Sequence, residues 1–110
     1  MAFPRVEHLR VLAAARAIEN QSYLILANRV GTDERVSFCG ISAIIDPNGV
    51  VVASASADRE ELLQVELSRE QIDSVRQQMP IFAHRRKGLL AESPSIVFYP
   101  AKCYSIPAGK

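Results

Sequence analysis

The chain has 110 residues, of which 48% are hydrophobic, and its formal net charge is +1. These values are typical of one globular domain, and they argue against a disordered chain and against a nucleic-acid or membrane surface as the main partner. Because no apolar run could span a bilayer and the first residues lack the pattern of a signal peptide, we expect a cytoplasmic protein.

The first predicted element is an amphipathic helix that starts near Pro4 and ends at Asn20. Late in this helix, Arg16 and Glu19 allow two interpretations. Either Arg16 complements the helix dipole while Glu19 is solvated, or the two form a buried ion pair that attaches the helix to a sheet. The apolar face is expected to contain residues at helical spacing, namely Val6, Leu9, Ala13 and Ala17.

An uninterrupted apolar run from Tyr23 to Ala27 predicts a central strand that is covered on both faces. Asn28 follows at the end of this strand, where α/β sheets commonly bind ligands. Since a buried carboxamide must find hydrogen-bond partners, Asn28 either bonds to the next loop or contacts a ligand in a pocket. The sequence supports both alternatives.

Residues 32–40 are predicted to form a loop, in which Gly40 supplies an unusual backbone angle or a close approach. A β-hairpin follows, with strands over Ile41–Ile45 and Val50–Ala55. Its turn, Asp46–Gly49, combines a proline that fixes one backbone angle with an Asn-Gly pair that accepts positive φ.

After the hairpin, alternating apolar and polar residues over Leu63–Leu67 favour an edge strand over a helix. Ser68 is then predicted to cap a helix, with the Gln71 side chain reaching back in a capping box. Pro80 is expected to end this helix.

Beyond Pro80 the periodic pattern ends. A basic run at residues 84–87 is expected to form a solvated face. Residues 89–110 are rich in proline and predict an extended, docked or disordered tail with a short strand over residues 96–99.

No complete catalytic constellation can be identified from the residues alone. A nucleophilic cysteine needs a low pKa and a nearby base, and for Cys39 that base could come only from His8 or His84 through the tertiary fold. Burial as a small hydrophobic side chain is the preferred interpretation of Cys39, and Cys103 lies in the tail. Neither histidine has a second ligand at metal spacing, so no metal site is expected.

Four short motifs follow one another in a recognisable order and spacing. They are Arg16-Ala17-Ile18-Glu19-Asn20-Gln21, Ala27-Asn28-Arg29-Val30-Gly31, Phe38-Cys39-Gly40-Ile41-Ser42 and Ile45-Asp46-Pro47-Asn48-Gly49. With them, the chain resembles the C-terminal part of the nitrilase superfamily, the carbon–nitrogen hydrolases, over about residues 5–88.

The resemblance implies an α/β fold, a four-layer α-β-β-α sandwich. This chain would form part of it, in the order helix, strand, hairpin, strand, helix, with an irregular tail. Residues 1–88 would be the C-terminal portion of the hydrolase domain and residues 89–110 a divergent or disordered tail. The family hydrolyses nitriles, amides or N-carbamoyl compounds through a cysteine nucleophile, a glutamate base and a lysine that stabilises the oxyanion, without a metal or organic cofactor.

The family's catalytic residues all lie upstream of the helix that begins this chain, so the resemblance assigns no catalytic residue here. It does imply two groups of other residues. Those at the wall of the substrate pocket are Asn28, Phe38 and Cys39. Those at a structural helix–sheet junction are Arg16, Glu19 and Asn20.

Three functions are therefore considered. The first is a C-terminal fragment of a carbon–nitrogen hydrolase that is inert alone. The second is an interaction module that self-associates or docks onto a complementary N-terminal half, because part of a sandwich leaves an open strand edge and an exposed face. The third is a small-ligand binding domain. Neither a nucleic acid nor a membrane is expected as a partner.

Overall fold

The computed structural model describes residues 1–91 and divides the chain into two units, Met1–Pro80 and Ile81–Lys110. The first unit contains two helices and five strands. In the described part of the second unit there is one short helix, α3 (Lys87–Ala91). No helix within residues 1–91 is both long enough and apolar enough to cross a membrane.

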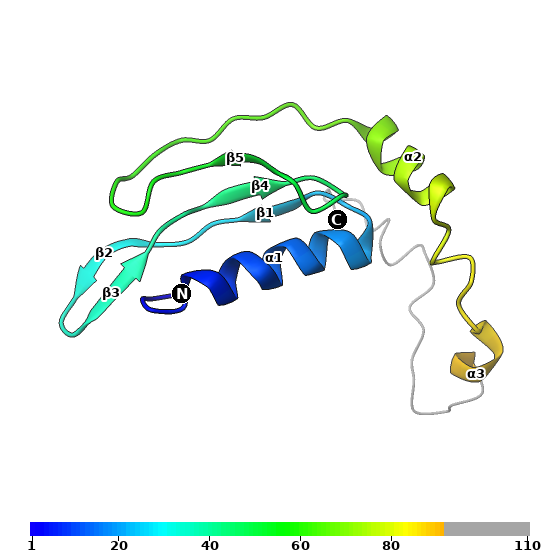
Figure 1. The fold of residues 1–110 in the computed structure, drawn as a ribbon, viewed down its shortest axis with the longest axis horizontal. Coiled ribbons are helices and arrows are strands. Elements are labelled where there is room, and N and C mark those ends of the chain that lie inside the picture. Colours follow the sequence, from blue (N-terminus) through cyan, green and yellow to red (C-terminus); the bar gives the residue numbers. More distant parts are fainter. Residues whose placement is uncertain (92–110) are drawn as a thin grey trace, which may run out of the picture. The chain divides into compact units, whose positions relative to one another are not determined.

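The centre of the first unit is a helix on an antiparallel sheet (Figure 1). Helix α1 (Val6–Asn20) lies against three strands in the order β1 (Leu24–Leu26), β4 (Ala43–Ile45), β5 (Val51–Ser54). The mixture of helices and antiparallel hairpins confirms the predicted α/β class.

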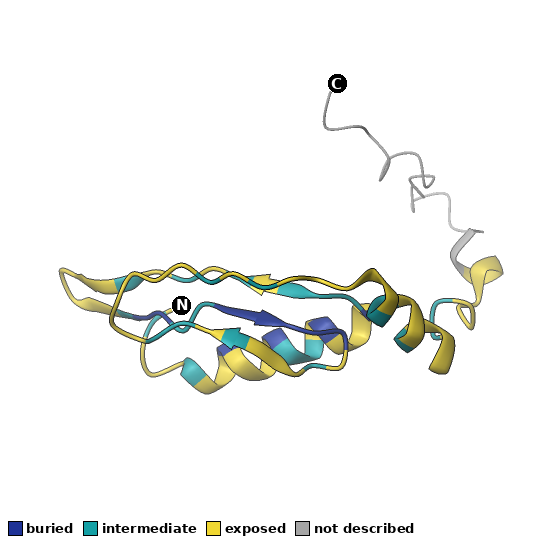
Figure 2. Cartoon of the chain, turned by 90° about the horizontal axis from the view of Figure 1, so that it is seen from above, coloured by how far each residue is buried: buried dark blue, intermediate teal, exposed yellow. Residues whose placement is uncertain are grey.

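The core lies between α1 and this sheet. Ala13 and Ala17 of the helix pack against Ala43 and Ile45 of β4, with partly buried leucines of β1 beside them. Alanines at the contact let the helix lie close to the strands. Strand β4 is buried along its whole length and is central to the sheet (Figure 2).

Strand β1 differs from the prediction. The run that starts at Tyr23 was expected to be covered on both faces, and this expectation is wrong for the structure. β1 is an edge strand, and Ile25 is 68% exposed while Leu24 and Leu26 are half-buried. Successive strand residues point to opposite faces, so α1 covers the two leucines and leaves Ile25 open.

Residues 32–40 do not form a loop, which corrects the second prediction. They belong to a second hairpin of β2 (Val30–Asp33) and β3 (Val36–Cys39). Its two-residue turn places Glu34 at a φ of +47°. The polar composition suggested a loop because this ribbon is held mainly by backbone pairing and most of its side chains face solvent.

The turn at residues 46–49 is confirmed. The Asp46 Oδ1 atom accepts hydrogen bonds from the backbone N–H groups of Asn48, at 2.8 Å, and Val50, at 2.9 Å. Gly49 has a φ of +82°, and a Cβ at this position would lie 2.7 Å from Ile18 Cδ1. Glycine is therefore required by both the backbone angle and the approach of α1.

The strand predicted over Leu63–Leu67 is also wrong. This stretch is extended, and no strand pairing is found in it. Figure 1 shows it passing back along the sheet toward α2 on the side away from α1. The apolar alternation that suggested a strand is real, because Leu63 and Val65 are half-buried and their neighbours are exposed.

Helix α2 (Arg69–Gln78) begins where the sequence predicted, and only half of the capping box is present. Ser68 Oγ accepts from the Gln71 backbone N–H at 3.3 Å. The Ser68 N–H donates to the Tyr23 hydroxyl instead of to Gln71. The Gln71 side chain is taken by other partners, because Tyr23 donates to its Oε1 and its Nε2 donates to Asp46 Oδ2 at 2.9 Å.

In the second unit, the basic residues 84–87 are exposed, as expected for a solvated face. The Arg85 guanidinium lies 5.0 Å from the centre of the Phe82 ring. The strand predicted over 96–99, Cys103 and the rest of the tail from residue 92 lie outside the described residues. The division after Pro80 falls before the predicted end of the domain at residue 88, which stays a prediction.

Candidate functional site

The most polar hollow of the first unit lies where β1 and β4 meet the ends of β5 and of the β2–β3 hairpin. Its volume is about 460 Å³. Hydroxyl, carboxamide, guanidinium and carboxylate groups line it, contributed by Asn28, Arg29, Ser42, Ser56, Arg59, Glu60 and Glu61. Of the three residues predicted at a pocket wall, Asn28 lines this hollow.

Asn28 is held on every side by hydrogen bonds. Its Nδ2 donates to Gly40 O at 2.8 Å, to Cys39 Sγ at 3.3 Å and to Met1 O at 3.1 Å. Its backbone N–H donates to Ser42 Oγ at 2.9 Å, and that hydroxyl in turn donates to Asn28 O at 3.1 Å. These contacts are what the structural interpretation of Asn28 expects, and they also aim a fixed carboxamide at the rim of the hollow.

Gly40 makes this arrangement possible. A Cβ on Gly40 would lie 2.8 Å from both Ala57 O and Val30 Cγ1, and its φ is +53°. The chain can therefore pass between the two hairpins only without a side chain at this position. Ser42 and Gly40 were not among the predicted site residues, although both belong to the third motif.

Cys39 is fully buried, which agrees with its interpretation as a small hydrophobic side chain. The Sγ atom donates to Met1 O at 3.3 Å and accepts from Asn28 Nδ2. Neither partner is a base that could remove the thiol proton. His8, one of the two bases considered, lies exposed on α1, and His84 belongs to the other unit.

Phe38 does not line the polar hollow. Its ring is half-buried, and the Arg29 guanidinium lies 4.5 Å from its centre. Arg29 also pairs with Asp33 at 3.3 Å. Phe38 instead borders a shallow hollow along the β2–β3 hairpin, beside Val36. The structure therefore brings Asn28 and Cys39 into contact and places Phe38 on another surface.

One carboxylate of the hollow is electrostatically distinct. Ser56 donates to Glu61 through both its hydroxyl and its backbone N–H, and Arg59 Nη2 lies 3.5 Å from Glu61 Oε1. The Ser56 hydroxyl bond lowers the pKa of Glu61, with smaller lowering contributions from the Ser56 N–H and the Arg59 charge that outweigh desolvation. Glu61 therefore stays ionised as an acceptor and is poorly suited to act as a general acid near neutral pH.

The residues predicted at the helix–sheet junction are mostly solvent-exposed. Arg16 and Glu19 form an ion pair at 2.6 Å, with side chains 58% and 54% exposed, so the buried-pair interpretation does not hold for this chain. Asn20 Nδ2 donates back to Arg16 O at 2.8 Å. The buried polar residue at this junction is Gln21, which is 2% exposed and was not singled out in the sequence.

Comparison with known proteins gives consistent matches. The sequence profile of the family described as carbon-nitrogen hydrolase matches residues 4–77. A 2-oxoglutaramate amidase of Paenarthrobacter nicotinovorans is 38% identical over 88 residues, which cover 79% of this chain and 29% of that protein. Omega-amidase YafV of Yersinia enterocolitica is 40% identical over 87 residues, with 78% of this chain and 34% of that protein covered.

The fold agrees with these sequence matches. The crystal structure of Saccharomyces cerevisiae Nit3, a member of branch 10 of the nitrilase superfamily, superposes with a TM-score of 0.67 at 36% identity. The match covers 77% of this chain and 32% of the yeast chain. The chain thus spans about a third of the length of the relatives it matches.

Proposed function

Because this chain belongs to the carbon–nitrogen hydrolase family, we propose that it is the C-terminal part of an amidase-type hydrolase and does not itself carry the catalytic residues. In this proposal it supplies a helix, a sheet and one wall of a substrate pocket. The nucleophile, base and oxyanion-stabilising lysine belong to the part of the relatives that this chain does not span.

The state of Cys39 is the observation that carries the proposal. Its thiol is fully buried, and its hydrogen-bond partners are a carboxamide and a backbone carbonyl. The first lysine in the sequence is Lys87, so no lysine precedes Cys39 in the order that the family uses. Neither the activation of a thiolate nor the stabilisation of an oxyanion is therefore supported at this cysteine.

Amide hydrolysis by the purified chain tests the proposal. With 2-oxoglutaramate as the probe, chosen from the name of a relative, we expect ammonia release at the rate of buffer alone, and the same result for Cys39→Ala. Addition of the N-terminal two thirds of the Paenarthrobacter amidase is expected to give turnover. Turnover by this chain alone that disappears in Cys39→Ala would overturn the proposal.

A self-associating module is the second candidate function. It is supported by the open edge of β1 and by Ile25, which is 68% exposed. A bare strand edge and an apolar face favour association with another chain. Light scattering should then show a dimer or larger species that Ile25→Asp converts to monomer, whereas a wild-type monomer at high concentration would contradict this candidate.

The proposal also includes a cytoplasmic location for the protein. Its support is the presence of only two cysteines, which do not make a disulfide framework. Fractionation of cells that express the protein would test the location, and recovery from an oxidising compartment would contradict it.

A further inference from the structure

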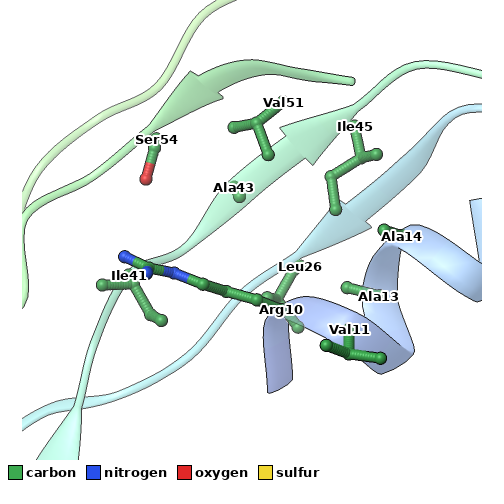
Figure 3. A pocket seen from close by; sticks show the side chains of 10 residues that line it. All are labelled: Arg10, Val11, Ala13, Ala14, Leu26, Ile41, Ala43, Ile45, Val51 and Ser54. Carbon is green, nitrogen blue, oxygen red and sulfur yellow. The ribbon is translucent and has the colours of Figure 1, made fainter. Parts of the chain in front are cut away.

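An apolar groove runs between α1 and the β4–β5 half of the sheet (Figure 3). Its volume is about 300 Å³. Ala13 and Ala14 form the helix side, and Ala43, Ile45 and Val51 form the sheet side. Arg10 extends from α1 toward Ile41 at one end, where it also pairs with Glu7 at 3.2 Å. The groove is separate from the polar hollow around Asn28.

The groove exists because one helix is too narrow for this sheet. Strands lie about 4.8 Å apart and a helix with its side chains is about 10 Å wide, so α1 can cover roughly two of the three strands. It packs chiefly on β1 and β4. Val51 on β5 is left 52% exposed, although cross-strand pairing with Ile45 puts it on the α1 side of the sheet.

We infer that this groove receives an amphipathic helix from the part of the hydrolase domain that this chain does not span. The inference rests on the proposed function, and it adds the surface and the kind of partner. The chain covers only 29% and 34% of two relatives, so about two thirds of each relative is available to provide such a helix.

A helix fits this surface better than a strand does. A groove on the face of a sheet presents side chains, whereas an added strand needs the backbone N–H and C=O groups that lie at a sheet edge. The alanines on the α1 side allow a second helix to approach to the usual interaxial distance of about 8–10 Å. The incoming helix must therefore present a stripe of aliphatic side chains at i, i+3 and i+4 spacing.

The experiment mixes this full chain with the N-terminal two thirds of the Paenarthrobacter amidase and measures the Kd by titration calorimetry. Val51→Asp is the test variant and Val36→Asp is the matched control. Both valines are exposed, at 52% and 45%, and Val36 lies away from the groove on β3. Far-UV circular dichroism of each free variant checks that it folds.

We expect Val51→Asp to raise the Kd by at least about tenfold, because the new carboxylate would be buried without a partner, and Val36→Asp to change it less than about twofold. Amide exchange should become slower in α1 and β5 on binding. In the partner, the newly protected segment should have helical chemical shifts.

Other outcomes separate the inference from the proposed function. A wild-type complex that Val51→Asp does not weaken would overturn the groove assignment and leave the proposed function standing. Self-association of this chain that Val51→Asp abolishes, without heterologous binding, would make a second copy the occupant and overturn the inference. No interaction and no turnover in the mixture would remove support from both.

Discussion

The Gln21 Nε2 atom donates a hydrogen bond to Met79 O at 2.7 Å, and so joins the end of α1 to the end of α2 across 58 residues of sequence. The same nitrogen lies 3.5 Å from Val75 O. Gln21 is 2% exposed and adopts a left-handed backbone conformation with a φ of +47°. A nearby second link joins Arg76 Nη2 to Asn20 O at 3.4 Å.

We predict that Gln21→Ala lowers the free energy of unfolding by about 1–3 kcal/mol, because it leaves the buried Met79 carbonyl without its donor. Asn20→Ala removes only an exposed hydrogen bond and should cost less than about 0.5 kcal/mol. Urea unfolding followed by circular dichroism measures both. Equal effects of the two substitutions would show that the Gln21 bond does not hold α2.

Asn28→Asp tests the network beneath the polar hollow. The substitution removes the amide donors to Gly40 O and Cys39 Sγ and places carboxylate oxygens against a carbonyl. We expect a loss of about 1–3 kcal/mol in unfolding free energy, together with faster amide exchange in β3. Thr32→Ala, which removes an exposed hydroxyl contact on the same hairpin, is the control. An unchanged unfolding midpoint in Asn28→Asp would contradict the network.

Gly40→Ala and Gly31→Ala form a matched pair. Both glycines have positive φ, at +53° and +95°, so alanine strains the backbone at either position by about 1–2 kcal/mol. Only Gly40 has neighbours that a Cβ would strike, which adds about 1–3 kcal/mol of steric cost. Thermal unfolding should therefore rank Gly40→Ala clearly below Gly31→Ala, and the reverse order would refute the close approach at Gly40.

The carboxyl of Glu61 should titrate below its ordinary pKa of 4.5, since the Ser56 hydroxyl bond stabilises the ionised form. Because the folded-state pKa is the lower one, the stabilising contribution is present above the unfolded pKa and is lost as the pH falls through the folded pKa. Carbon-13 NMR titration of Glu61 measures this directly. Ser56→Ala should move the midpoint upward, and no movement would assign the lowering to another cause.

Much of the fold was predictable because the relevant signals are local. The helix, the Asp46–Gly49 turn and the Ser68 cap each depend on residues within a few positions of one another, and each is present. Two predicted features failed for nonlocal reasons. Residues 30–39 look polar like a loop, yet backbone pairing makes them a hairpin, and Leu63–Leu67 alternates like a strand without having a partner strand here.

The candidate site was only partly predictable. A carboxamide at a strand end pointed to Asn28, and an unpaired cysteine pointed to a buried Cys39. Nothing local indicated that Ser42 would clamp the Asn28 backbone or that Ser56 would pair with Glu61. Gln21 was missed because a glutamine just after a helix is usually solvated, and its burial depends on α2, which arrives more than 45 residues later.

The sequence by itself determined the helix, the central hairpin and membership of a hydrolase family, since motif order and short-range turn chemistry do not depend on how the chain packs. Only the tertiary structure decided that Ile25 faces outward, that Gln21 rather than Arg16 is the buried polar residue at the junction, and that an apolar groove remains open beside α1. Burial depends on which distant elements come together, and in this chain a single helix covers a sheet wider than itself.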